Sequence, residues 1–212
     1  MNVVVFGATG GTGRTVLRLA GEAGHRVTAF ARNPAAVTTP GVRVAPGDVE
    51  DAGAVADAVE GADAVVSALG IGYSRAATTV YSVGTAHIVA AMRAHRVRRL
   101  LCVSTTSMAR PSWRAAPAQR ALTALLLKPL LRRPYRDMAR MESIVRTADD
   151  LDWTLVRAAR LTAGQLTGRY RMSPPNGQLP GAWSVSRADL ACCLVQSLEE
   201  KAVYRSVVEI AY

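Results

Sequence analysis

The sequence predicts an α/β fold, with a doubly wound parallel sheet that forms a single domain over residues 1–212. Apolar runs of strand length alternate with stretches whose apolar residues recur at helical spacing, an order typical of parallel sheets covered by helices. Hydrophobic residues make up 50% of the chain and aromatic residues only 5%, so valine, leucine and alanine build the expected core. A chain of 212 residues is long enough to bury one sizeable core.

The first predicted strand, residues 3–6, stops at a cluster of glycines, and a helical pattern follows at once. The cluster has the spacing G-x-x-G-x-x-G with one further glycine inserted: Gly7, Gly10, Gly11 and Gly13. Glycines let the chain turn sharply and let backbone N–H groups approach a diphosphate at the positive end of the helix. This loop, with Thr9 and Thr12, is therefore predicted to bind a dinucleotide; the alternative is a glycine-rich turn without a ligand.

The second predicted strand, residues 27–31, is followed by Arg32. Folds selective for NAD carry an acidic residue about 20 positions after the glycines, where it binds the ribose 2′-hydroxyl. An arginine instead binds a 2′-phosphate, and each hydrogen bond to a charged group is worth about 1.5–3 kcal/mol. The sequence thus predicts NADP(H) rather than NAD(H) as cofactor; in the alternative, Arg32 is only a solvated loop residue.

The following elements are predicted from apolar runs and helical repeats. They are a helix at 15–23, strands at 42–45 and 63–68, a glycine-rich turn at 69–72 and a long helix at 78–95. Gly24 ends the first helix, and Pro34 opens a short helical turn after the second strand.

Asp48 follows the third predicted strand and lies at the carboxyl edge of the sheet, where open α/β sheets bind ligands. Its carboxylate can accept a hydrogen bond from an adenine amino group. Alternatively it caps the helix that starts near Asp51. Both roles hold together if Asp51 is the capping residue.

The carboxyl-terminal half continues the alternation. Strands are predicted at 100–104, 153–157 and 207–210, and helices at 119–131, 135–148 and from 186 onward. Pro129 kinks or ends the first of these helices, and Ser186 followed by Asp189 is typical of a capped helix start. Turn residues are frequent at 165–181, so a small substrate-pocket region is expected over about residues 158–185.

The net charge of +10 is concentrated, because residues 109–140 contain eight basic residues against Asp137 alone. This excess is either an electropositive rim that attracts an anionic cofactor and substrate or a solvated arginine-rich face. Residues 110–134 are expected to form a lid or packing helix, with a dimer contact or a membrane-surface helix as alternatives. Nucleic acid is a disfavoured partner, since aromatic residues do not interleave with the charge.

Other classes of protein are disfavoured by what the sequence lacks. The chain has no apolar run of about 18 residues and no signal-peptide pattern at its start, so a cytoplasmic protein without a membrane span is expected. Cys102, Cys192 and Cys193 are odd in number and fit no zinc spacing, which favours buried thiols. His87 and His95 have no carboxylate or cysteine at ligand spacing, so no metal is expected.

These motifs resemble the atypical short-chain dehydrogenase/reductases with an NAD(P)H-binding domain, above all the NADPH-dependent flavin reductase/biliverdin-IXβ reductase family. The resemblance covers nearly the whole chain through residues 7–13, 27–32, 47–49, 69–70, 78–80, 88–95, 104–105 and 166–168. It implies a Rossmann-like fold, NADPH as hydride donor, and a planar conjugated acceptor, such as a flavin or a linear tetrapyrrole, beside the nicotinamide.

The resemblance also implies residue roles. Beyond the glycine loop, the implied cofactor contacts are Arg32 on the 2′-phosphate, Asp48 and Val49 at the adenine, and Ala68, Leu69 and Gly70 under the ribose and nicotinamide. The hydroxyl beside the nicotinamide falls on Thr105, with Ser104 before it. A histidine of the family is replaced here by Arg160, which can bind an acidic substrate or an electron-rich ring. Ser104, Thr105 and Arg160 are thus the expected catalytic residues, and Ser104 is also expected to contact the cofactor.

The tyrosine–lysine pair of alcohol dehydrogenation is missing, since Tyr135 is followed four residues later by Ala139. Tyrosine without that lysine is a poor base, whereas hydride transfer to a flavin or tetrapyrrole depends mainly on proximity. Two alternatives stay open: a non-catalytic NADP(H)-binding redox sensor, and a reductase or epimerase of a sugar or polyketide that uses Tyr135 or Arg160. The chain is expected to be a monomer or a homodimer.

Overall fold

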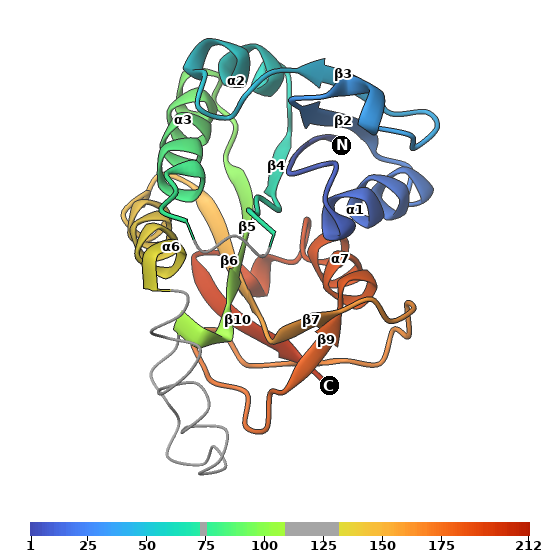
Figure 1. Cartoon of the computed structure of the whole chain (residues 1–212), viewed down its shortest axis with the longest axis vertical. Coiled ribbons are helices and arrows are strands. Elements are labelled where there is room, and N and C mark those ends of the chain that lie inside the picture. The colour runs from blue at the N-terminus through green and yellow to red at the C-terminus, as the bar shows by residue number, and fades with distance from the viewer. Residues whose placement is uncertain (73–75, 109–131) are drawn as a thin grey trace.

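The computed structural model describes residues 1–72, 76–108 and 132–212. Within them, eight strands form one sheet in the order β3-β2-β1-β4-β5-β6-β10-β8, and all neighbours are parallel except the antiparallel β8 (Figure 1). The strands are β1 Asn2–Phe6, β2 Arg26–Ala31, β3 Arg43–Pro46, β4 Ala64–Ser67, β5 Arg99–Thr105, β6 Asp152–Ala158, β8 Arg171–Met172 and β10 Ser206–Ala211. A separate parallel pair consists of β7 Arg160–Thr162 and β9 Ser184–Ser186.

Helices cover both faces of the sheet, which confirms the doubly wound α/β prediction (Figure 1). One face carries α1 Gly11–Glu22 and α7 Arg187–Gln196, and the other carries α2 Ala52–Val59, α3 Val80–Ala94 and α6 Arg132–Arg146. Three short 3-10 turns complete the described elements: η1 Pro34–Ala36, η2 Thr106–Met108 and η4 Lys201–Val203. No helix of the described ranges is long and apolar enough to cross a membrane.

The two faces of the sheet follow from the alternation of side chains along each strand. In β1, Val4 and Phe6 pack in the cluster under α2, α3 and α6, while Val3 and Val5 pack under α1 and α7. Because the central strands are buried on both sides, their sequences are continuously apolar rather than alternating.

Several element boundaries differ from the predictions. Helix α1 begins at Gly11 rather than at residue 15, because the glycines themselves form its first turn. Helix α6 begins at Arg132, earlier than the predicted residue 135. The turn-rich segment also contains β8, which lies at the edge of the sheet. The predicted helix at 119–131 lies outside the described residues, as do residues 110–131 of the predicted lid.

Candidate functional site

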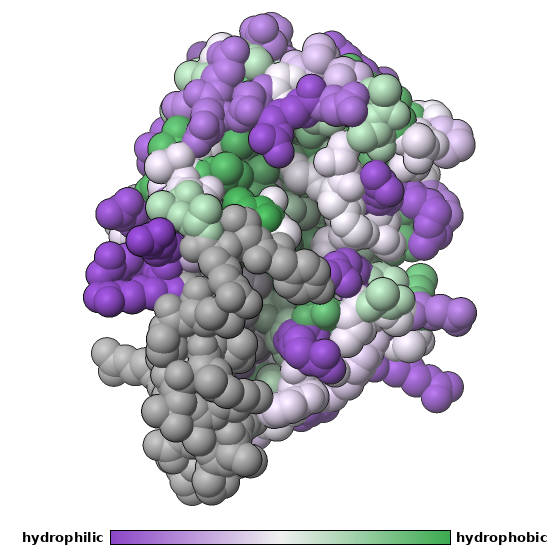
Figure 2. Space-filling view, in the orientation of Figure 1, coloured by the Kyte–Doolittle hydropathy of each residue, from purple (hydrophilic) through white to green (hydrophobic). Residues whose placement is uncertain are grey.

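The site lies at the carboxyl edge of the sheet, where the strand order reverses between β1 and β4. Sheets of this kind bind ligands at such a switch point. Figure 2 shows a hollow across the middle of this view, with hydrophobic residues beside it and hydrophilic residues around its rim. The predicted cofactor residues follow strands β1 to β4, except for Ser104, which lies near the end of β5. The topology therefore brings them to one edge of the sheet.

The glycine loop turns directly from β1 into α1. Gly7 has a φ of +75°, and its carbonyl accepts a hydrogen bond of 3.0 Å from the N–H of Gly10. Gly10 caps α1 without a side-chain hydrogen bond, and the first turn of α1 carries no acidic residue. The N–H groups at the positive end of α1 are therefore open to an anion. Thr9 is half-buried and Thr12 is buried in the same loop.

Two of the four glycines are required by the protein's own packing. A Cβ atom on Gly7 would lie 2.3 Å from the carbonyl oxygen of Ala68, and one on Gly13 would lie 2.1 Å from the carbonyl oxygen of Gly7. A Cβ atom on Gly10 would have a single neighbour within 4 Å, the carbonyl oxygen of Gly7 at 3.3 Å. Gly10 itself is exposed. Gly7 and Gly13 thus bring β1, α1 and the end of β4 together, while Gly10 leaves room beside the loop.

Arg32 and Asp48 stand at the ends of the neighbouring strands β2 and β3. Nη1 of Arg32 lies 4.0 Å from Oδ2 of Asp48, and the two side chains are 78% and 47% exposed. Such an exposed pair is worth at most about 1 kcal/mol, so the guanidinium remains available to a ligand. Asp51 is the residue that caps α2, as the sequence allowed, because it accepts the N–H groups of Gly53 and Ala54, and Asp48 is not needed for that role.

Val49 and the segment after β4 pack together over α3. A Cβ atom on Gly84 would lie 2.7 Å from a methyl group of Val49 and 3.2 Å from one of Leu69. The carbonyl of Val49 also lies 3.0 Å from Nδ1 of His87. Leu69 and the adjacent Ala68 are half-buried and Gly70 is exposed, so this wall of the site combines an apolar base with an open rim.

Ser104 and Thr105, at the end of β5, point to opposite faces of the sheet. The Ser104 hydroxyl is buried and donates a hydrogen bond of 2.7 Å to Oε1 of Glu142 in α6. Thr105 is half-buried, and its hydroxyl oxygen accepts a 3.3 Å hydrogen bond from the N–H of Ser107. The structure thus directs Ser104 toward α6, whereas the Thr105 hydroxyl donates no hydrogen bond to the residues that the structure describes.

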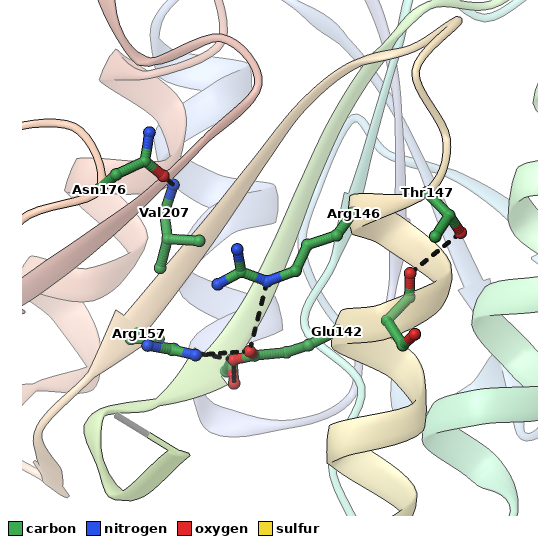
Figure 3. A network of polar contacts seen from close by, with 8 residues as sticks. Glu142, Arg146, Thr147, Arg157, Asn176 and Val207 are labelled. Carbon is green, nitrogen blue, oxygen red and sulfur yellow. Dashed lines mark hydrogen bonds and ion pairs between the residues drawn. The ribbon is translucent and has the colours of Figure 1, made fainter. Parts of the chain in front are cut away.

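Glu142 is the centre of a buried ionic network that sequence reasoning missed (Figure 3). Arg157 of β6 donates to both of its carboxylate oxygens, at 2.9 and 2.6 Å, and Nε of Arg146 lies at 3.9 Å. Burial alone would raise the pKa of Glu142, but the hydrogen bonds from Arg157 and Ser104 and the nearby positive charges outweigh it and lower the pKa. The available signal was Arg157 itself, a charged residue within an apolar strand.

A pocket of about 290 Å³ opens beside the end of β5. Its walls come from η2 and from the first turns of α6: Ser107, Met108, Arg132, Tyr135, Arg136 and Ala139. Asp137 holds this part of α6 against α3, because its buried carboxylate accepts the N–H groups of Tyr81 and Ser82 at 3.0 and 3.2 Å. The pocket combines an aromatic ring and a thioether with two cationic side chains.

Arg160, the third expected catalytic residue, is exposed in the small sheet and pairs with Ser184. Thr105 pairs with Ala158 in the main sheet, so Arg160 lies just beyond the strand that adjoins Thr105. The predicted capped start of α7 is confirmed, since the Ser186 hydroxyl accepts the N–H of Asp189 at 2.9 Å.

A family model described as NAD(P)H-binding matches residues 7–201 of this chain. A protein from Burkholderia pseudomallei is 26% identical, with a TM-score of 0.79 and coverage of 100% of both chains. ChuY, an anaerobilin reductase from Escherichia coli O157:H7, is 22% identical, with a TM-score of 0.80 and coverage of 100% of this chain and 97% of its own. A short-chain dehydrogenase/reductase from Veillonella parvula in complex with NADP is 18% identical, with a TM-score of 0.76 and coverage of 100% and 94%. These likenesses confirm the predicted fold.

Proposed function

Since this chain belongs to the NAD(P)H-binding family, we propose that it is an NADPH-dependent reductase of a flat, conjugated and anionic acceptor, such as a flavin nucleotide or a linear tetrapyrrole. The observation that carries the proposal is the placement of a cationic, aromatic pocket directly after β5, at the same sheet edge as the glycine loop. An anion-accepting helix end and an acceptor pocket thus share one edge, as hydride transfer between two bound molecules requires.

The residues present fit a dinucleotide. The uncapped start of α1 suits a diphosphate, and the exposed Arg32 suits a 2′-phosphate. Under the proposal, Asp48 and Val49 line the adenine, and the segment Ala68 to Gly70 passes under the ribose and nicotinamide. The complex of the Veillonella parvula relative with NADP supports the choice of cofactor.

When bound, NADPH would be the source of the hydride, and the proton that completes the reduction of the acceptor would come from water. The chain's own residues hold the two flat molecules face to face, and this proximity accounts for the rate. The Thr105 hydroxyl donates a hydrogen bond beside the nicotinamide. Arg132 and Arg136 bind acidic groups of the acceptor in the pocket, and Arg160 binds a further one from the small sheet.

Reduction of a panel of acceptors tests the proposal. Purified protein, NADPH and FMN, riboflavin, biliverdin or a quinone are mixed without oxygen, and oxidation of NADPH is followed by stopped flow. We expect acceptor-dependent oxidation of NADPH, fastest with the anionic acceptors. Protein that binds NADPH but oxidises it with none of these acceptors would contradict the proposal and favour a redox sensor.

Replacement of Arg32 by alanine is expected to weaken NADPH binding about ten- to a hundredfold while NADH binding changes little. The 2′-phosphate loses its charge-assisted hydrogen bonds, and NADH has no such group. Dissociation constants for both cofactors provide the measurement. Arg43→Ala is the control, because Arg43 is exposed at the opposite end of the adjacent strand and its loss changes the net charge equally. Equal affinities of the unmodified protein for NADPH and NADH would refute the assignment.

Replacement of Arg136 by alanine is expected to raise the KM for FMN about five- to tenfold and to leave the KM for riboflavin nearly unchanged. FMN carries a phosphate that the pocket arginine binds, whereas riboflavin carries none. Arg140→Ala is the matched control, since Arg140 is exposed on the same helix and does not line the pocket. Equal changes of KM for the two flavins would contradict a phosphate contact.

A further inference from the structure

The side chain of Arg187 passes directly over Gly11, the first residue of α1. A Cβ atom on Gly11 would lie 2.8 Å from Cδ of Arg187 and 3.4 Å from its Nε. Arg187 is the first residue of α7, and α7 lies beside α1 on one face of the sheet (Figure 1). Its guanidinium is therefore held at the amino-terminal end of α1, in the glycine loop.

This placement brings two positive charges together. The amino-terminal end of a helix carries a partial positive charge, and a cation beside it is destabilising unless an anion compensates. The first turn of α1 supplies no acidic residue. Within residues 1–72, 76–108 and 132–212, Arg187 forms no ion pair. The protein thus maintains a cationic site whose compensating anion is not among its described side chains.

The nearest acidic residue along α7 is committed elsewhere. The buried carboxylate of Asp189 accepts the N–H groups of Thr167 and Gly168 and the hydroxyls of Thr167, Ser186 and Tyr212, at 2.6 to 3.0 Å. These bonds fix the start of α7, and with it the backbone of Arg187, relative to the adjoining loop. Asp189 therefore orients Arg187 while leaving its charge uncompensated.

We propose that Arg187 is a cofactor-binding residue whose guanidinium binds the diphosphate of NAD(P)H, together with the N–H groups at the start of α1. A guanidinium presents two parallel donors that match phosphate oxygens. A side chain on Gly11 would have to displace this arginine. The inference rests on the cofactor of the proposed function and adds the residue from α7 that binds the part common to NADH and NADPH.

Dissociation constants for NADPH, NADH and ADP-ribose test this role in Arg187→Gln. All three ligands share the diphosphate, so each is expected to bind about ten- to a hundredfold more weakly, with the NADPH/NADH preference unchanged. Arg32→Ala should instead weaken the binding of NADPH alone and so reduce the NADPH/NADH preference. Arg26→Gln is the control for net charge, because Arg26 is exposed at the amino end of β2. Arg187→Met, which keeps an apolar stem, is expected to lose as much affinity as Arg187→Gln.

Unchanged affinities in both Arg187 variants, or a loss for NADPH alone, would overturn the inference. An unchanged affinity for ADP-ribose beside a loss for the two dinucleotides would overturn it as well, because it would place Arg187 at the nicotinamide. The melting temperature of each ligand-free variant shows whether the fold is intact. If the unmodified protein binds both dinucleotides but reduces no acceptor, the reductase proposal fails. The role of Arg187 can still be tested, because its test measures binding and not turnover.

Discussion

Replacement of Glu142 by glutamine is expected to lower the free energy of unfolding by about 3–5 kcal/mol. Glu142 is 5% exposed, and its carboxylate accepts hydrogen bonds from Arg157 (Figure 3). It also accepts one from the Ser104 hydroxyl. An amide of the same shape removes the charge, leaves the largely buried guanidinium of Arg157 without a counter-ion and directs N–H donors toward it. Equilibrium unfolding in urea provides the measurement.

Two further variants show whether the loss of stability in Glu142→Gln arises because the Glu142–Arg157 ion pair is buried. Glu22→Gln removes one partner of the exposed Arg18–Glu22 pair and is expected to cost less than about 1 kcal/mol. Glu142→Leu combined with Arg157→Met removes both charges and is expected to recover most of the loss, because no unpaired charge stays buried. A Glu142→Gln variant no less stable than Glu22→Gln would contradict this account of the network.

The same network predicts how stability depends on pH. Because the pKa of Glu142 is lowered in the folded protein, the folded state takes up this proton less readily than the unfolded chain. The contribution is therefore fully present above the unfolded pKa of about 4.3 and is lost as the pH falls through the lower folded value. The stability difference between the unmodified protein and Glu142→Gln should accordingly shrink below about pH 4. A difference that is constant down to pH 2 would rule out ionised Glu142 as its source.

The sheet and the glycine loop could be predicted from the sequence because each depends on residues close together in the chain. The strand 3–6, the glycines and the first helix are contiguous, so local pattern alone identifies the turn between them. Arg32 was equally accessible, since its position relative to the glycines follows from the length of one strand–helix–strand unit. The parallel order of the strands then places both at one edge.

Contacts between distant elements could not be predicted in this way. Glu142 meets Ser104 and Arg157 only because α6 crosses the ends of β5 and β6, and Arg187 meets Gly11 only because α7 packs beside α1. A general signal existed, since a charged residue within an apolar strand needs a partner. Arg99 follows the same rule: it is buried and donates to the carbonyl groups of Ser197 and Leu198 at the end of α7. The sequence identifies such residues but not their partners.

Replacement of Gly13 by alanine is expected to lower the free energy of unfolding by about 3 kcal/mol or more, a large part of the total for a domain. The added methyl group would lie 2.1 Å from the carbonyl oxygen and 2.8 Å from the carbonyl carbon of Gly7. These are backbone atoms, and Gly7 has no freedom to withdraw, because its own Cα faces the carbonyl of Ala68. Thermal and urea unfolding measure the loss.

Alanine variants of two other glycines, Gly21 and Gly10, distinguish the effect of packing on stability from the effect on ligand binding. Gly21 also lies in α1 but has nothing within 4 Å of an added Cβ, so Gly21→Ala is expected to stabilise the protein by about 0.5–1 kcal/mol. Gly10→Ala is expected to destabilise the protein less than Gly13→Ala, because its methyl group would lie 3.3 Å rather than 2.1 Å from the carbonyl oxygen of Gly7. Under the proposed function it also weakens NADPH binding. Gly13→Ala with an unaltered melting temperature would contradict this division. In this chain the repeated glycine spacing therefore meets two separate demands under the proposed function, since Gly7 and Gly13 allow β1 and α1 to pack and Gly10 is proposed to let the cofactor approach.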